Sequence, residues 1–225
     1  MGLILSIETS TTVCSAALHH ERELIASEVT HVPNTAASQL AVMIDKILKQ
    51  SSRSIDAVAV SSGPGSYTGL RIGVATAKGI CYALGVPLIA VGSLEIMTAQ
   101  VSETLKVRNE RLCPMIDARR MEVYTALYNN TLDLIEPVQA RVIDGSSYSE
   151  VLDQQKVLFF GNGSQKCKGV ISHANAVFIE GIFPSAEWLG QLAFDRFRKG
   201  KFEDVAEFEP FYLKDLIAKK PKSLV

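Results

Sequence analysis

The chain has 225 residues, of which 47% are apolar and 21% are charged, as in an ordinary globular protein that builds its own core. Its net charge of −1 excludes a basic field that would attract nucleic acid by itself. No apolar run approaches the roughly 20 residues of a membrane-spanning helix. We therefore expect a soluble, cytoplasmic protein that meets RNA, if at all, through a partner.

The first hundred residues alternate between short apolar runs and longer periodic segments. Strands are expected at 3–7, 13–18, 24–29, 57–61 and 86–91, and helices at about 34–49 and 68–84. This order, three strands and then helices alternating with strands, predicts a mixed sheet. It is the order of the RNase H-like lobe found in actin, sugar kinases and Hsp70.

The second half repeats the order with fewer helical signals. Strands are expected at 111–116, 122–128, 138–143, 157–160 and 176–179, and a last helix at about 185–198. The predicted fold is therefore α/β and actin-like/RNase H-like (ASKHA), with two lobes that each hold a mixed sheet and flanking helices. Residues 1–105 would form the N-terminal lobe, and residues 106–225 a smaller C-terminal lobe plus a tail.

The cysteines and the start of the chain indicate the compartment. Cys14, Cys81, Cys113 and Cys167 are widely spaced and form no C-x-x-C pair, which favours buried free thiols in a reducing compartment. The segment from Met1 to Ser6 carries no basic region and runs directly into a strand. We expect no signal peptide.

A glycine-rich segment, Gly63-Pro-Gly-Ser-Tyr-Thr-Gly69, connects a predicted strand to a predicted helix, where backbone N–H groups could bind a phosphate. It does not match a P-loop, because no Gly-Lys-Ser/Thr follows and position 71 is Arg. It also lacks the G-x-G-x-x-G spacing. We favour a tight turn that starts a closely packed helix.

The turn that begins at Glu8 occupies the place where actin-like ATPases bind phosphate. Glu8, Thr9 and Ser10 supply an acid and hydroxyls, but side chains here would keep a polyphosphate away from the backbone. The equivalent turn of the second half carries Asp117, followed by Ala118 where a glycine would help. We interpret Glu8, Thr9, Ser10 and Asp117 as a vestigial nucleotide site, with ATP chemistry by this chain as the alternative.

Metal ligands and catalytic residues are not indicated. The histidines, His19, His20, His31 and His173, form no His-x-x-x-His pair and are expected to be solvated surface side chains. No Gly-x-Ser-x-Gly segment marks a nucleophile. The basic tail with Lys214, Lys219, Lys220 and Lys222 is expected to be solvated, with contact to RNA or a partner as the alternative.

The two helices of the first half are unusually apolar. The apolar arc of the 34–49 helix is wider than the ~100° stripe of a helix that covers one sheet face. The 68–84 helix carries only two charges, at positions 71 and 78. Since one sheet edge can hardly cover a helix on nearly all sides, we predict helix–helix packing with another subunit, as homodimer or heterodimer. The predicted partner-binding residues are Leu40, Met43, Ile44, Ile47, Gly69, Arg71, Gly73 and Ala77.

These segments closely resemble the TsaB (YeaZ) family, the partner subunit of bacterial tRNA threonylcarbamoyladenosine synthase. The resemblance is dense over about residues 1–128. It rests on Ile4-Leu-Ser-Ile-Glu-Thr-Ser10 with Cys14-Ser-Ala-Ala17, on the segment from Gly63 to Gly73, on Met115-Ile-Asp-Ala-Arg-Arg120 with Glu122-Val-Tyr124, and later mainly on Pro210-Phe-Tyr-Leu213.

The resemblance implies a non-catalytic scaffold that binds and stabilises the catalytic paralogue TsaD through a bundle of the two first-lobe helices. It also implies the ATPase TsaE in the larger assembly, ATP and a metal ion in the partner subunits, no cofactor in this chain, and only indirect contact with tRNA. The product is the modified adenosine next to the anticodon of ANN-decoding tRNAs. Two alternatives stay open: an actin-like ATPase or phosphotransferase that uses Glu8, Asp117 and the turn at 161–163, or a homodimeric regulatory binding protein.

Overall fold

The computed structural model describes residues 2–33 and 35–213, and the predicted basic tail lies outside this range. The strands and helices, in chain order, are β1 (Leu3–Glu8), β2 (Cys14–His20), β3 (Glu23–Thr30), α1 (Ala36–Leu48), β4 (Ala57–Gly63), α2 (Tyr67–Leu84), β5 (Leu88–Gly92), α3 (Ser93–Leu105), β6 (Arg111–Asp117), β7 (Glu122–Tyr128), β8 (Leu134–Val142), α4 (Ser149–Leu152), β9 (Val157–Phe160), α5 (Ser164–Cys167), β10 (Ala176–Ile179) and α6 (Ala186–Arg198).

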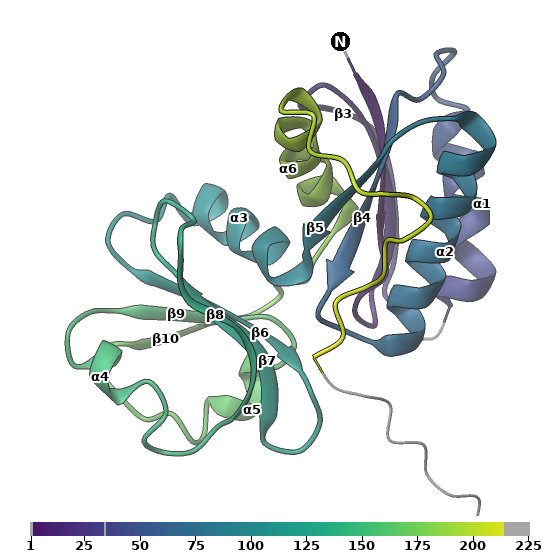
Figure 1. Cartoon of the computed structure of the whole chain (residues 1–225). Coiled ribbons are helices and arrows are strands. Elements are labelled where there is room, and N and C mark those ends of the chain that lie inside the picture. Colours follow the sequence, from purple (N-terminus) through teal and green to yellow (C-terminus); the bar gives the residue numbers. More distant parts are fainter. Residues whose placement is uncertain (1, 34, 214–225) are drawn as a thin grey trace, which may run out of the picture.

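The strands form two five-stranded sheets with the same topology (Figure 1). The first has the order β3-β2-β1-β4-β5, and the second, read in the matching direction, β8-β7-β6-β9-β10. In each sheet the first three strands of the repeat are antiparallel, and the fourth and fifth run parallel to the first. The predicted actin-like architecture of two lobes, each with a mixed sheet and flanking helices, is confirmed.

Helix α3 is the largest element that the sequence did not reveal. Seven of its thirteen residues are buried, including Ser93 and Thr98, so the helix is enclosed on more than one side. A helix in such a place needs no single apolar stripe, and its sequence shows none. Its apolar residues Leu94, Met97 and Val101 pack on the second sheet.

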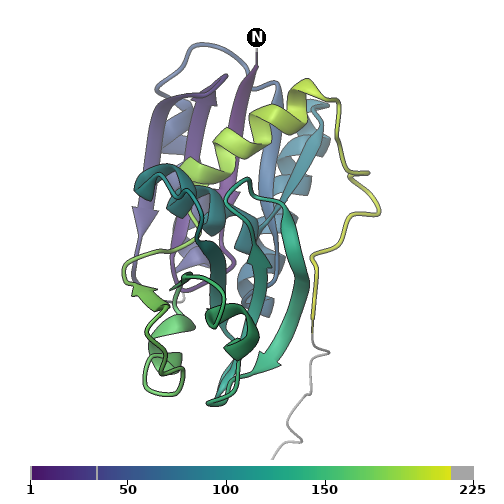
Figure 2. The ribbon, with the colours of Figure 1, turned by 90° about the vertical axis from the view of Figure 1, so that its left-hand side faces the viewer.

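Helices cover both faces of the first sheet. On one face, α1 and α2 pack side by side over residues such as Leu5 and Ile7. On the other face α6 lies across Ile4 and Ala59, as Figures 1 and 2 show. The approach of α6 is close, because a Cβ at Gly190 would lie 2.2 Å from Nδ1 of His19.

The packing of α6 adjusts the predicted division of the chain. We retain residues 1–105 and 106–225 as the proposed lobes, because each part contains one complete sheet. However, α6 comes from the second part and covers the first sheet, while α3 comes from the first part and covers the second sheet. The last helix of each repeat therefore joins the two lobes.

After α6 the chain returns along the first lobe as a segment without helix or long strand and with a turn at 205–207. We call this segment, residues 202–213, the C-terminal strap (Figure 1). Glu203 N donates to the carbonyl oxygen of Leu88 at the edge of the sheet, at 2.9 Å. Nζ of Lys78 on α2 donates to the carbonyl oxygens of Ala206 and Phe208, at 2.9 and 3.1 Å. The strap thus covers the flank of α2 that faces away from α1.

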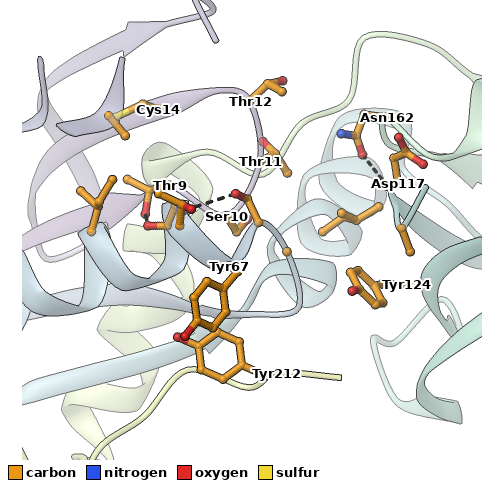
Figure 3. A pocket seen from close by; sticks show the side chains of 18 of the residues that line it. Thr9, Ser10, Thr11, Thr12, Cys14, Tyr67, Asp117, Tyr124, Asn162 and Tyr212 are labelled. Carbon is orange, nitrogen blue, oxygen red and sulfur yellow. Dashed lines mark hydrogen bonds between the residues drawn. The ribbon is translucent and has the colours of Figure 1, made fainter. Parts of the chain in front are cut away.

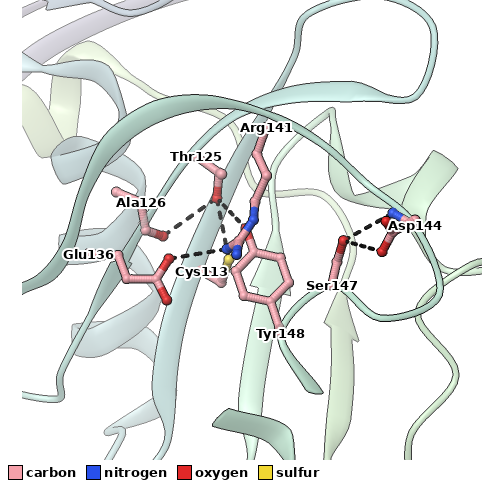
Figure 4. Close-up of polar contacts among 8 residues, drawn as sticks. All are labelled: Cys113, Thr125, Ala126, Glu136, Arg141, Asp144, Ser147 and Tyr148. Atoms are coloured by element: carbon pink, nitrogen blue, oxygen red, sulfur yellow. Dashed lines mark hydrogen bonds and ion pairs between the residues drawn. The ribbon is translucent and has the colours of Figure 1, made fainter. Parts of the chain in front are cut away.

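In the second lobe, side chains cover the sheet face where the first lobe has long helices. The Arg141 guanidinium lies 4.3 Å from the ring centroid of Tyr148, and its Nη1 donates to Glu136 Oε2 at 3.1 Å (Figure 4). The Tyr148 hydroxyl lies 3.2 Å from Thr125 Oγ1. Tyr148 belongs to the hydrophobic core of the second lobe, and the network holds its ring in place. We therefore assign the network a structural role.

Within the described ranges, no helix has the length and apolarity that crossing a bilayer would require.

Candidate functional site

A pocket with a volume of about 700 Å³ lies between the two lobes. Its walls come from the turn after β1, the N-terminus of α2, the turn after β6, and the end of the strap (Figure 3). Most of its polar groups are hydroxyls, such as those of Thr9, Thr11, Thr12 and Tyr124, whereas Asp117 and Arg119 are its charged residues. The predicted nucleotide residues Thr9, Ser10 and Asp117 are therefore brought together here.

Glu8, the fourth predicted nucleotide residue, does not line this pocket. Its side chain is fully buried, and Oε1 accepts a hydrogen bond from Ser10 N. Burial raises the pKa of the Glu8 carboxyl, while hydrogen bonds from Ser10 and Ser61 oppose this rise. The prediction that places Glu8 in the vestigial nucleotide site is corrected: the side chains of β1 alternate, and Glu8 falls on the sheet face on which α6 packs.

Thr9 and Ser10 serve the packing of α2. The Thr9 hydroxyl donates to the Gly69 carbonyl oxygen at 2.7 Å, and Ser66 N donates to the Ser10 carbonyl oxygen at 2.6 Å. A Cβ at Gly65 would lie 2.2 Å from the Ser10 carbonyl oxygen. The glycine-rich segment is thus a tight turn that starts a closely packed helix, as predicted, and its close neighbour is the chain's own backbone.

Asp117 is held by neighbours within its own lobe. Its carboxylate forms an ion pair with Lys166, whose Nζ also donates to the Glu122 carbonyl oxygen at 2.7 Å. Asp117 N donates to Asn162 Oδ1 at 3.0 Å, which links this turn to the turn at 161–163. The carboxylate of the second acidic turn is therefore paired with a cation of its own lobe.

As predicted, the four cysteines are free and buried. The histidine prediction is wrong for His19, which is only 1% exposed because α6 packs over it. Burial lowers the pKa of His19, and Glu187 opposes this shift. In the ranges 2–33 and 35–213, no three His, Cys, Asp or Glu side chains are placed to hold a metal ion.

The structure corrects the set of predicted partner-binding residues. Leu40, Met43, Ile44 and Ile47 are at most 6% exposed, because they face the chain's own sheet. On α2 the small residues also face inward: Gly69, Gly73 and Ala77 are buried. A Cβ at Gly73 would lie 2.2 Å from Thr9 Oγ1. Of the eight predicted residues, only Arg71 has an exposed side chain.

The apolar sides of α2 led to the prediction that another subunit covers this helix, but the strap covers one of these sides. The sheet, α1, the turn after β1 and the strap each cover one side of the helix, and Phe208 of the strap packs against the same core. The solvent side of α1 and α2 stays exposed. We call it the outer face, and its residues include Ala41, Val42 and Asp45 of α1, Lys49 at the end of this helix, and Arg71, Ala75, Gly79 and Tyr82 of α2.

Replacing Glu8 by glutamine is expected to stabilise the fold at neutral and alkaline pH. Because burial raises the pKa of Glu8, the folded state is penalised wherever the unfolded chain would ionise this carboxyl. The gain in unfolding free energy should be small near the ordinary pKa of glutamate. Above that pH it should grow by about 1.4 kcal/mol per pH unit until the raised pKa is reached.

Urea denaturation of both proteins at several pH values between 4 and 9 measures this gain. The exposed Glu150, changed to glutamine, is the matched control and should show no such pH-dependent gain. A Glu8→Gln protein that is less stable than the parent throughout this range would contradict the argument.

Comparisons with known proteins agree with this architecture. A family model described as "TsaD: tRNA N6-adenosine threonylcarbamoyltransferase" matches residues 21–222. The protein named tRNA threonylcarbamoyladenosine biosynthesis protein TsaB of Bacillus subtilis (strain 168) is 32% identical over 176 residues, 75% of this chain and 74% of the relative. The protein of the same name from Escherichia coli (strain K12) is 32% identical over 227 residues, 96% of both chains.

A comparison with a solved structure supports the same family. YeaZ from Pseudomonas aeruginosa superposes with a TM-score of 0.82 at 27% identity, over 95% of this chain and all of that one. This likeness spans nearly the whole chain and therefore both sheets. The chain belongs to the family that the matching model describes and, within it, to the TsaB (YeaZ) proteins of tRNA threonylcarbamoyladenosine biosynthesis.

Proposed function

We propose that this chain is a non-catalytic scaffold subunit, which binds and stabilises a TsaD-like catalytic paralogue in the cytoplasm. The pair would take part in making threonylcarbamoyladenosine next to the anticodon of ANN-decoding tRNAs, together with a TsaE-like ATPase. ATP and the metal ion would be bound by the partner subunits. The names of the relatives support the pathway, and the chain's own surface supports the binding role.

The outer face carries this proposal. Val42 of α1 and Tyr82 of α2 are 61% and 88% exposed, and Tyr82 lies on the same face of α2 as the small residues Ala75 and Gly79. Large apolar side chains gathered on two adjacent helices indicate a protein-binding surface. Small residues between them allow the backbone of a partner helix to approach closely.

The enzyme alternative has weaker support. Two carboxylates would have to act on ATP, yet Glu8 is enclosed beneath α6 and Asp117 is paired with Lys166. Glu8 is buried away from the pocket, and the Asp117 carboxylate, which lines it, would have to break its ion pair with Lys166 to act as a general base. ATP turnover by the isolated chain, abolished in an Asp117→Ala protein, would favour this alternative over the scaffold.

The decisive experiment mixes the chain with its TsaD-like paralogue at micromolar concentration and measures the mass of the complex by light scattering. We expect a mixed complex, and tRNA modification that requires both chains. If the measured mass is that of a homodimer and no mixed complex forms, the result favours the regulatory alternative and overturns the scaffold proposal.

A further inference from the structure

Arg71 differs from the other cation of α2 in how it is held. Nζ of Lys78 is occupied by two carbonyl oxygens of the strap. Helix α2 contains no acidic residue that could pair with Arg71 at a spacing of three or four. Among the residues that the structure describes, Arg71 forms no ion pair, although its side chain lies on the outer face.

One aromatic side chain, Tyr67, holds the Arg71 guanidinium instead. Its Nη1 donates to the Tyr67 hydroxyl at 2.9 Å, and its Cζ lies 5.2 Å from the centroid of the Tyr67 ring. These contacts leave other N–H groups of the guanidinium free to donate. Because a guanidinium on an aromatic ring loses little freedom on binding, it is prepared to receive a planar anion.

Tyr67 is itself held by the strap. Its ring centroid lies 4.9 Å from that of Tyr212, and Figure 3 shows the two rings together at the edge of the pocket. The strap is anchored next to Tyr212, since Phe211 N donates to the Ser62 carbonyl oxygen at 2.7 Å. Tyr212, near the end of the described chain, thus supports Tyr67, more than 100 residues away in sequence. Tyr67 in turn contacts Arg71 on the outer face.

We propose that Tyr212 is a positioning residue: through Tyr67 it holds Arg71 to bind a carboxylate side chain of the subunit that packs on the outer face. This inference rests on the proposed function. A carboxylate is the favoured occupant because it matches the guanidinium fork and because Arg71 has no acidic partner among the described residues. Docking would remove water from the pair and strengthen it.

Affinity for the TsaD-like paralogue, measured by calorimetry, tests the proposal with three proteins. Arg71→Ala should weaken binding by about tenfold or more, as expected for a charge pair at an interface. Tyr212→Ala should weaken it by roughly threefold to tenfold, because the guanidinium loses its fixed position. The double variant should bind no worse than Arg71→Ala, and this non-additivity is the signature of a positioning role.

Two further measurements separate positioning from general damage. Tyr212→Phe keeps the ring contact and should bind like the parent. The loss caused by Arg71→Ala should shrink as salt rises, because a charge pair is screened. Thermal unfolding of each variant checks that the lobe is intact.

The other outcomes overturn the inference in distinct ways. Additive losses from Tyr212→Ala and Arg71→Ala mean that the strap acts independently of Arg71. If Arg71→Ala binds normally while a bulky substitution at Gly79 blocks the complex, the interface exists without this carboxylate. Loss of tRNA retention by the assembly, with unchanged subunit affinity, means that Arg71 contacts phosphate. Failure of the parent chain to bind the paralogue at all refutes the proposed function itself.

Discussion

Replacing Gly79 by leucine is expected to weaken association with the TsaD-like paralogue by about 1–3 kcal/mol, a factor of roughly 5 to 150, and to leave the fold intact. Gly79 lies on the outer face, and a Cβ built there meets no atom within 4 Å. The added side chain therefore points away from the chain's own core. It would stand where a partner helix has to approach closely.

The fold should become slightly more stable in this variant, because glycine inside a helix costs about 1 kcal/mol relative to a good helix former. Calorimetry with the paralogue and urea denaturation of the isolated chain measure the two effects separately. Gly169→Leu is the matched control, since this second-lobe glycine is also exposed and open. Normal binding by Gly79→Leu would show that α2 does not face the partner here.

Replacing Gly73 by alanine should have the opposite effect on stability. A Cβ at Gly73 would lie 2.2 Å from Thr9 Oγ1, so α2 or the turn after β1 must shift. We expect a loss of about 1–3 kcal/mol of unfolding free energy, although alanine is the better helix former. Urea denaturation measures the loss, and its sign distinguishes a tightly packed helix from an open one.

A second substitution identifies the clashing atom. Thr9→Ala removes Oγ1 and should rescue much of the stability of Gly73→Ala. It should not rescue Gly69→Ala, because a Cβ at Gly69 would lie 2.1 Å from the Thr9 carbonyl oxygen, which every residue retains. If Gly73→Ala is as stable as the parent, the close approach of α2 to this turn is not the reason for the glycine.

These two positions separate roles that look identical in the sequence. Gly73 and Gly79 both interrupt an apolar helix, and both raise the question of what comes close to the backbone. At Gly73 the close neighbour is the chain's own Thr9, whereas at Gly79 no atom of the described residues comes within 4 Å of the added Cβ. Only the second glycine is available to a partner, so substitutions at Gly73 would report on folding instead of binding.

Local signals in the sequence were sufficient for most of the fold. The strands at 122–128, 157–160 and 176–179 were predicted with their observed bounds, and the helix at 68–84 began only one residue late. Alternating and helical periods are local properties, so a short window contains the information. The repeated order of elements then identified the two-lobed architecture, because few topologies accept it.

The candidate site depended on contacts between distant segments. Glu8 was recognised as the acid of a phosphate-binding turn, but its enclosure beneath α6 joins residues almost 180 positions apart. Similarly, the apolar directions of α2 were read correctly from its sequence, yet the strap that covers one of them comes from residues 202–213.

The sequence by itself thus determined which residues are apolar, small or charged on each helix, and which secondary structure they form. Only the tertiary structure decided what covers each side of those helices, and therefore that Leu40 and Gly73 pack inward while Gly79 and Arg71 face outward. The physical reason is that burial is a property of a pair of surfaces. The helical period of a sequence reveals the apolar side of the helix. The segment that packs on this side can come from anywhere in the chain, and no local pattern identifies it.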